Sequence, residues 1–182
     1  MNDLRKENKM SLVERNDDGA ICRLLLNQPG RLNVLSDDLL NTLQVELDGL
    51  RKSKNVRCVI ISGAGNGFCA GHDLKEMTKQ RQNSDGGVAY FQDLFVRCSK
   101  MMTTIQSLPQ PVIAQVHGIA TAAGCQLVAS CDLAVADKSA RFGVNGVNIG
   151  LFCSTPMVAL TRAIGRKRAF EMLVTGRFIE AK

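Results

Sequence analysis

The sequence predicts an α/β fold in which strands alternate with helices in packed layers. Runs rich in branched apolar residues at 56–61 and 112–116 have the composition of strands buried on both faces. Between these runs, apolar residues recur every three or four positions, which is the spacing of one helix face. A length of 182 residues suits one domain of this kind.

The N-terminal half begins with a charged stretch, residues 1–10, which we interpret as an extension of a core domain at 11–182. Two apolar strands flank Asn16-Asp17-Asp18-Gly19, whose Asp-Gly pair predicts a hairpin. Ser36 is expected to cap the next helix, with acidic residues in its first turn. The leucines of that helix fall on one face: Leu39, Leu40, Leu43, Leu47 and Leu50.

The C-terminal half follows a glycine-rich loop at 63–71, which leads into a short helix. Residues 79–87 are polar and predict an exposed loop, and a helical stripe at 91–108 stops at Pro109 and Pro111. The remaining elements are a strand at 112–116, a helix at 121–129, a strand at 133–136 and helices after Pro156. Residues 177–182 begin a further element, so we expect a C-terminal helical unit to be absent.

Composition excludes several classes of function. Subtracting 17 acidic from 23 basic residues leaves a charge of +6, which is too small to require nucleic acid as a partner. The seven cysteines are an odd number without a paired C-x-x-C spacing, which favours reduced thiols. Residues 1–10 lack the apolar core of a secretory signal. We therefore expect a reducing compartment, either the cytoplasm or the mitochondrial matrix.

Metal and membrane sites are not expected. The two histidines, His72 and His117, lie outside any cluster of ligating residues. The longest nearly apolar stretch, 119–136, is interrupted by Gln126 and Asp132 and is rich in small residues. The sequence predicts a protein without metal or membrane partners.

Two strand-to-helix junctions could face one ligand atom. The first is the glycine-rich loop at 63–71, and the second is the small-residue segment at 117–126. Backbone N–H groups at the starts of two helices could converge on an oxygen and form an oxyanion hole. The alternative is that the small residues only allow close helix–sheet packing. The spacing alone leaves both interpretations open.

A set of motifs resembles the enoyl-CoA hydratase/isomerase (crotonase) family. They are Phe68-Cys69-Ala70-Gly71-His72-Asp73-Leu74-Lys75-Glu76, Pro111-Val112-Ile113-Ala114 and Ala123-Gly124-Cys125-Gln126-Leu127. The run from Ala122 to Asp132 most resembles the branch named enoyl-CoA hydratase domain-containing protein 3. The resemblance implies a crotonase-type spiral of β-β-α units and a homotrimer or hexamer. It also implies an acyl-CoA substrate in fatty-acid metabolism, with CoA as part of the substrate and no separate cofactor.

The resemblance also implies particular site residues. The backbone amides of His72 and Ala123 would hold the thioester oxygen as an oxyanion hole. His72 as an imidazole base is the alternative, and His117 is expected to be structural. Substrate contacts would come from both amide residues and from Gly30, Arg31, Leu32, Ala70, Asp73, Leu74 and Lys75.

This sequence departs from the family at both hydratase glutamates. Gln126 and Gly146 stand at those positions, and neither side chain can exchange a proton near neutral pH. Ordinary hydration is therefore not expected. The open readings are an enzyme that depends on its oxyanion hole (a weak hydratase, lyase, hydrolase or decarboxylase) and an inactive acyl-CoA-binding or regulatory homologue. Installing Glu at 126 and 146 together is expected to raise hydration.

The segment at 151–156 is the other departure. Cys153 is a candidate thiolate nucleophile, with a buried and unreactive thiol as the alternative. Ser154 is better suited to capping a helix than to attacking a substrate. Asn145 and Asn148 could position a water molecule but cannot act as bases.

Overall fold

Three β-β-α units follow one another along the chain, with one strand and two helices between the first two. The structure is a computed structural model that describes residues 11–181, so the expected extension at 1–10 lies outside the described residues. The first unit is β1 (Val13–Asp18), β2 (Ile21–Leu26) and α1 (Asp37–Arg51). Next come β3 (Cys58–Gly63), α2 (Leu74–Gln80) and α3 (Val88–Gln106). The predicted α/β class and the repeated unit are therefore present.

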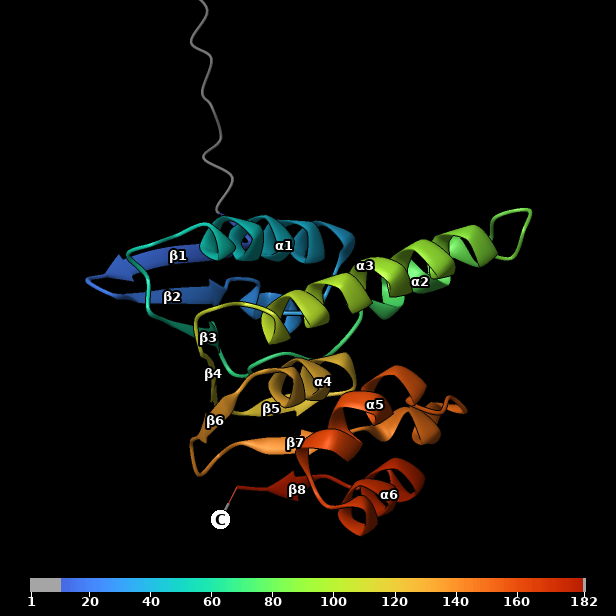
Figure 1. The fold of residues 1–182 in the computed structure, drawn as a ribbon. Helices are drawn as coiled ribbons and strands as arrows, with labels where there is room; N and C mark the ends of the chain where they lie inside the picture. Colours follow the sequence, from blue (N-terminus) through green and yellow to red (C-terminus); the bar gives the residue numbers. More distant parts are fainter. Residues whose placement is uncertain (1–10, 182) are drawn as a thin grey trace, which may run out of the picture.

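The second and third units have the same order. They are β4 (Val112–Val116), β5 (Ile119–Thr121) and α4 (Ala123–Ser130), and then β6 (Leu133–Ala136), β7 (Arg141–Gly143) and α5 (Ser154–Ala163). The short 3₁₀ helices η1 (Pro29–Arg31) and η2 (Asn145–Ile149), the helix α6 (Arg166–Thr175) and the strand β8 (Ile179–Glu180) complete the description. Figure 1 shows the units stepping from the blue N-terminal end to the red C-terminal end.

Two sheets divide the strands of these units between them. The first sheet has the order β1-β2-β3-β4-β6, with only β1 antiparallel to its neighbour, and the second has the order β5-β7-β8. The chain thus crosses from one sheet to the other within the second and third units. Figure 1 shows α4 lying over β5, and α5 packs beside α4.

The core confirms the predicted helix faces. The five leucines of α1 are at most 1% exposed, and Ser36 caps the helix by accepting from the Leu39 N–H at 3.2 Å. On α3 the predicted stripe is buried at Leu94, Cys98, Met102 and Ile105. These contacts anchor α1 and α3 to the first sheet, and Figure 1 shows α3 passing between α1 and α4.

Several boundaries differ from the sequence prediction. The strand predicted at 56–61 forms two residues later, at Cys58–Gly63. The hairpin turns at Gly19 and Ala20, because β1 extends to Asp18 and pairs there with Ile21. The loop expected at 79–87 begins later, since α2 continues to Gln80. The helix expected from residue 121 begins at Ala123, because 119–121 form β5 and join the second sheet.

Candidate active site

The glycine-rich loop at 63–71 is held in place by a side chain that the sequence analysis did not single out. Asn33 is fully buried and lies in the left-handed region with φ +52°. Its Nδ2 donates to the carbonyls of Ala64 and Gly67, both at 2.9 Å, and its Oδ1 accepts from the Gln28 N–H at 2.8 Å. The available signal was the tolerance of asparagine for positive φ after a Pro-Gly pair.

The two strand-to-helix junctions touch through their backbones. A Cβ built on Gly71, which has φ +88°, would stand only 3.2 Å from the Ala123 nitrogen. A Cβ on Gly124 would overlap the carbonyl oxygen of Cys69 and lie 2.7 Å from its carbonyl carbon. Glycine is therefore required on both sides of the contact. As a result, the backbone of His72, which follows Gly71, lies beside the start of α4.

The N–H groups of the two predicted residues have no backbone acceptor within the described part of the chain. Ala123 is the first residue of α4, where an N–H has no intrahelical partner. Ala122 precedes it at φ +50° and ψ −120°, and its N–H donates to the Gly143 carbonyl at 2.9 Å. Such a conformation in a non-glycine residue costs about 1–3 kcal/mol and is typical of functional sites. Both orphan donors can therefore serve a ligand.

Both ring nitrogens of His72 are buried, and neither has a hydrogen-bond partner within residues 11–181. It packs edge-on against Phe95 of α3, with ring centroids 5.8 Å apart. Burial lowers the pKa of this imidazole, against weaker opposing effects from the Leu35 backbone and the Asp37 charge. The lowered pKa makes the ring a weaker proton acceptor, and no group within residues 11–181 hydrogen-bonds to it to orient it, so neither observation supports the imidazole as a base. His117 instead donates from Nε2 to the Gly65 carbonyl at 2.7 Å, in keeping with a structural role.

Asp73 is committed to the protein rather than to a ligand. Its Oδ1 accepts from the N–H groups of Lys75 and Glu76 at 3.0 and 3.3 Å, and its other oxygen pairs with Arg31. The Asp73 side chain is only 3% exposed. It therefore caps α2 and ties that helix to the turn at 28–33.

The other predicted substrate contacts surround the same turn. The Ala70 N–H donates to the Leu32 carbonyl at 3.0 Å, which joins the two loops. Leu32 and Leu74 are 39% and 55% exposed, and Gly30 and Lys75 are exposed as well. Leu74 lines a hollow of about 310 Å³ between α2 and residues 149–151. These residues form an accessible rim around the two amides.

Gln126 occupies the face of α4 that carries Ala123, because the two residues are three positions apart. It is 8% exposed, and its Oε1 is buried without a partner among the described residues. Gly146 offers no room for a side chain, since a Cβ there would overlap the Leu151 carbonyl oxygen and lie 2.8 Å from the Cys153 Sγ. A Glu at 146 would therefore have to displace this loop, and the expected gain in hydration from Glu at both positions stays a prediction.

The segment at 151–156 is mostly structural. Burial raises the pKa of the Cys153 thiol, which supports the unreactive reading over the nucleophile. Ser154 is the first residue of α5 and makes no capping hydrogen bond, so its predicted role as a cap is wrong. Asn145 is occupied through its Oδ1, which accepts from the Thr121 hydroxyl at 2.6 Å.

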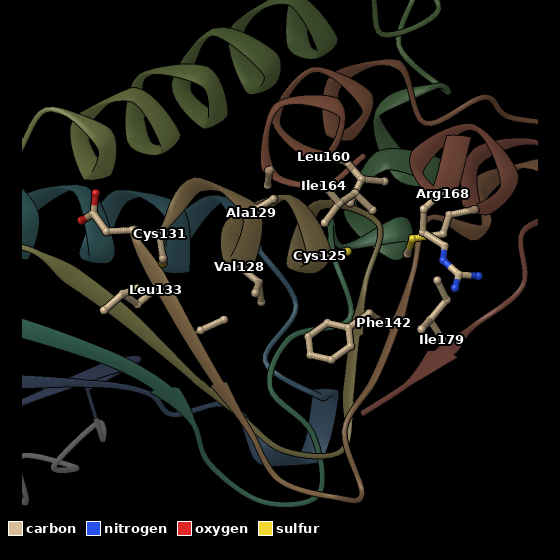
Figure 2. A pocket seen from close by; sticks show the side chains of 14 residues that line it. Cys125, Val128, Ala129, Cys131, Leu133, Phe142, Leu160, Ile164, Arg168 and Ile179 are labelled. Carbon is tan, nitrogen blue, oxygen red and sulfur yellow. The ribbon is translucent and has the colours of Figure 1, made fainter. Parts of the chain in front are cut away.

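Two cavities lie on opposite faces of α4. The larger, about 420 Å³, is an apolar groove over Cys125 and Val128, closed by Phe142 and Ile179 as Figure 2 shows. The smaller, about 190 Å³, lies between α3, α4 and α5 on the face of Gln126. Only the smaller cavity shares its helix face with Ala123, so it is the one that adjoins the candidate site.

Comparison with known proteins gives the class. The sequence profile described as enoyl-CoA hydratase/isomerase matches residues 16–182. The chain therefore belongs to the enoyl-CoA hydratase/isomerase family. Within it, the chain is 52% identical over 162 residues to the mitochondrial enoyl-CoA hydratase domain-containing protein 3 of Xenopus laevis, covering 89% of this chain and 53% of the relative. The human protein of that name is 48% identical over 163 residues, covering 90% of this chain and 52% of the relative. The expected branch is thus confirmed.

Solved structures confirm the crotonase-type fold. An enoyl-CoA hydratase from Mycobacterium smegmatis superposes with a TM-score of 0.87 at 52% identity, over 93% of this chain and 65% of that one. Human enoyl-CoA hydratase domain-containing protein 3 gives a TM-score of 0.86 at 45% identity, over the same shares. The chain spans about half the length of the curated relatives it matches.

Proposed function

We propose that this protein binds acyl-CoA thioesters and holds the thioester oxygen between the N–H groups of His72 and Ala123. One observation carries the proposal: Gly71 and Gly124 bring the two junctions into backbone contact beside two N–H groups that lack acceptors. A structural junction would not need an unpaired donor on each side. The orphan donors favour the oxyanion-hole interpretation over simple close packing.

The electrostatics of the site support an enolate intermediate. When a bond next to the thioester carbonyl breaks heterolytically, negative charge moves onto the carbonyl oxygen. The N-terminus of α4 carries a partial positive charge from its unpaired N–H groups. One well-placed donor to such an oxygen contributes about 2.7–4 kcal/mol to the transition state. Two such donors are therefore enough to favour a reaction that passes through an enolate.

The CoA portion would lie along the accessible rim. Lys75 supplies positive charge there for phosphate groups, next to the Arg31–Asp73 ion pair, and Leu32 and Leu74 supply apolar surface for the pantetheine arm. In this proposal CoA is part of the substrate, and no separate cofactor takes part.

Ordinary hydration is not the reaction that these residues favour. Adding water to an enoyl thioester needs groups that exchange protons, and Gln126 and Gly146 cannot do so. Decarboxylation needs no base, because the carbon–carbon bond pair passes to the enolate as CO₂ leaves, and water can then supply the proton. We propose an enolate-forming enzyme of this kind, with the substrate's own carboxylate as the leaving group.

The second candidate is an acyl-CoA-binding homologue without catalysis. The observation in its favour is that position 146 has no room for a side chain, so no glutamate could act from there. Both candidates predict binding of CoA thioesters, and only the first predicts turnover.

A panel of thioesters separates the candidates. Enoyl-, malonyl- and β-hydroxyacyl-CoA esters would be tested for turnover by chromatography and for binding by calorimetry. Release of CO₂ from a malonyl-type ester supports the enzyme, and binding without any turnover supports the inactive homologue. Failure of every ester to bind contradicts both candidates.

Assembly and compartment are further parts of the proposal. We propose a homotrimer or hexamer in the mitochondrial matrix or the cytoplasm. The Xenopus and human relatives are named as mitochondrial proteins, which supports the first compartment. Within residues 11–181, no helix has the length and apolar character needed to cross a bilayer. Light scattering coupled to gel filtration would measure the assembly.

A further inference from the structure

The small cavity beside Gln126 is a built pocket between three helices. Phe95, Cys98 and Met102 of α3 form one wall, and Val158 and Ala159 of α5 form another. The Phe95 ring also contacts the His72 imidazole. The cavity therefore begins next to one of the two residues that supply orphan amides, where the acyl group of a bound thioester would lie.

A polar group inside this pocket lacks a partner. Gln126 is more than nine-tenths buried, with 8% of its surface exposed, and its Oε1 has no hydrogen bond within residues 11–181. A buried polar group left unpaired is unfavourable. A ligand with a polar end would therefore be preferred there over a purely apolar one. The Oε1 can only accept, so it does not itself select an anion, whereas the Nε2 of the same carboxamide can donate to a carboxylate.

The charge of the lining selects the sign of that polar end. Arg162 on α5 is the one charged residue among those that line the pocket, and no acidic side chain lines it. Arg162 forms no ion pair within the described part of the chain, although other arginines, such as Arg97 and Arg168, do. A guanidinium matches a carboxylate better than any neutral group.

The size of the pocket limits the acyl chain. Its volume is about 190 Å³, and a protein cavity of about 150 Å³ can hold benzene. The pocket therefore accommodates an acyl group of roughly four to six carbon atoms. Longer chains would have to leave it.

We propose that the pocket selects short acyl groups that end in a carboxylate, with Arg162 pairing with the carboxylate and Gln126 hydrogen-bonding to it. This inference rests on the proposed binding of CoA thioesters and names their class: half-thioesters of short dicarboxylic acids. Arg162 and Gln126 are specificity-determining residues in this account.

The test compares two ligands of equal length. Glutaryl-CoA and pentanoyl-CoA both carry five-carbon acyl groups and differ by a terminal carboxylate, and calorimetry on the whole chain gives the ratio of their dissociation constants. The wild type is expected to bind glutaryl-CoA about five-fold more tightly. Arg162→Gln is expected to bring the ratio to about one, and Arg162→Lys to restore part of the preference.

Arg168→Gln is the matched control, because it removes the same charge from a residue that lines the other groove. It is expected to leave the ratio unchanged, and melting curves would check that each variant folds. Equal binding of the two ligands by the wild type overturns the inference while leaving the proposed function intact, as does a preference that survives Arg162→Gln. If neither ligand binds, the proposed function fails and this inference fails with it.

Discussion

Replacing Gly124 with alanine tests whether the two junctions must touch. The added Cβ would lie 2.7 Å from the Cys69 carbonyl carbon and would overlap its oxygen, whereas an ordinary contact begins at 3.4 Å. The start of α4 must therefore move away by at least the difference, which is about 0.7 Å. The neighbour is backbone and cannot rotate aside, so the strain is expected to cost about 1–3 kcal/mol of unfolding free energy.

The same displacement should weaken the site more than the fold. Moving the Ala123 N–H away from the thioester oxygen removes one donor, which is worth roughly a hundred-fold or more in a catalytic rate. Calorimetry with acetoacetyl-CoA and thermal melting would measure both effects. Gly165→Ala is the control, since nothing lies within 4 Å of a Cβ at that position and its φ is negative. If Gly124→Ala changes neither the binding of acetoacetyl-CoA nor the Tm, and Gly165→Ala changes neither as well, the close contact between Gly124 and the Cys69 carbonyl is refuted.

Three further substitutions test the surroundings of the site. Ala122→Gly should relieve the strain at φ +50° and raise the free energy of unfolding by about 1 kcal/mol, or roughly 3 °C in Tm. The control Ala129→Gly, within α4, should lower the Tm. Equal losses of Tm in both variants would contradict the strain at Ala122. Asn33→Ala should lower the free energy of unfolding by about 3 kcal/mol in chemical denaturation, because it removes the three hydrogen bonds of this buried side chain. The exposed Asn83→Ala provides the comparison, and a loss no larger than in this control would show that Asn33 does not hold the glycine-rich loop. Burial lowers the pKa of the His72 imidazole in the folded protein. On acidification the unfolded chain therefore takes up a proton at His72 before the folded protein does. The folded state accordingly loses stability as the pH falls below the ordinary histidine pKa of about 6.5. His72→Phe should therefore lose less Tm than wild type between about pH 7.5 and about pH 5.5, with His117→Gln as control, and an identical loss in wild type and His72→Phe would show that the ring does not titrate as argued.

Much of the fold could be predicted because local and tertiary preferences agree. The α1 leucines and Ser36 specify a capped amphipathic helix on their own, and β4 and β6 were located at 112–116 and 133–136 as predicted. The strand β5 was missed because its three residues pair only with distant segments: with β7, about twenty positions later, and through a bridge at Ala120 with Cys69, about fifty positions earlier. A short strand defined by a distant partner leaves little trace in local periodicity.

The position of the site could be predicted from the sequence, but the residues that hold its backbone in place could not. The small residues at both junctions indicated that two helix starts could converge. The roles of Asn33 and Ala122 depend on backbone dihedral angles, which an asparagine or alanine in the sequence does not announce. The lack of space at Gly146 was also invisible, because it arises from the return of the chain at Leu151 and Cys153.

A crystal structure of the protein soaked with acetoacetyl-CoA is the most direct measurement. The account predicts that the thioester oxygen sits at about 2.7–3.1 Å from the nitrogens of both His72 and Ala123. A bound thioester whose oxygen points elsewhere, or side chains filling the space between those two nitrogens, would contradict it.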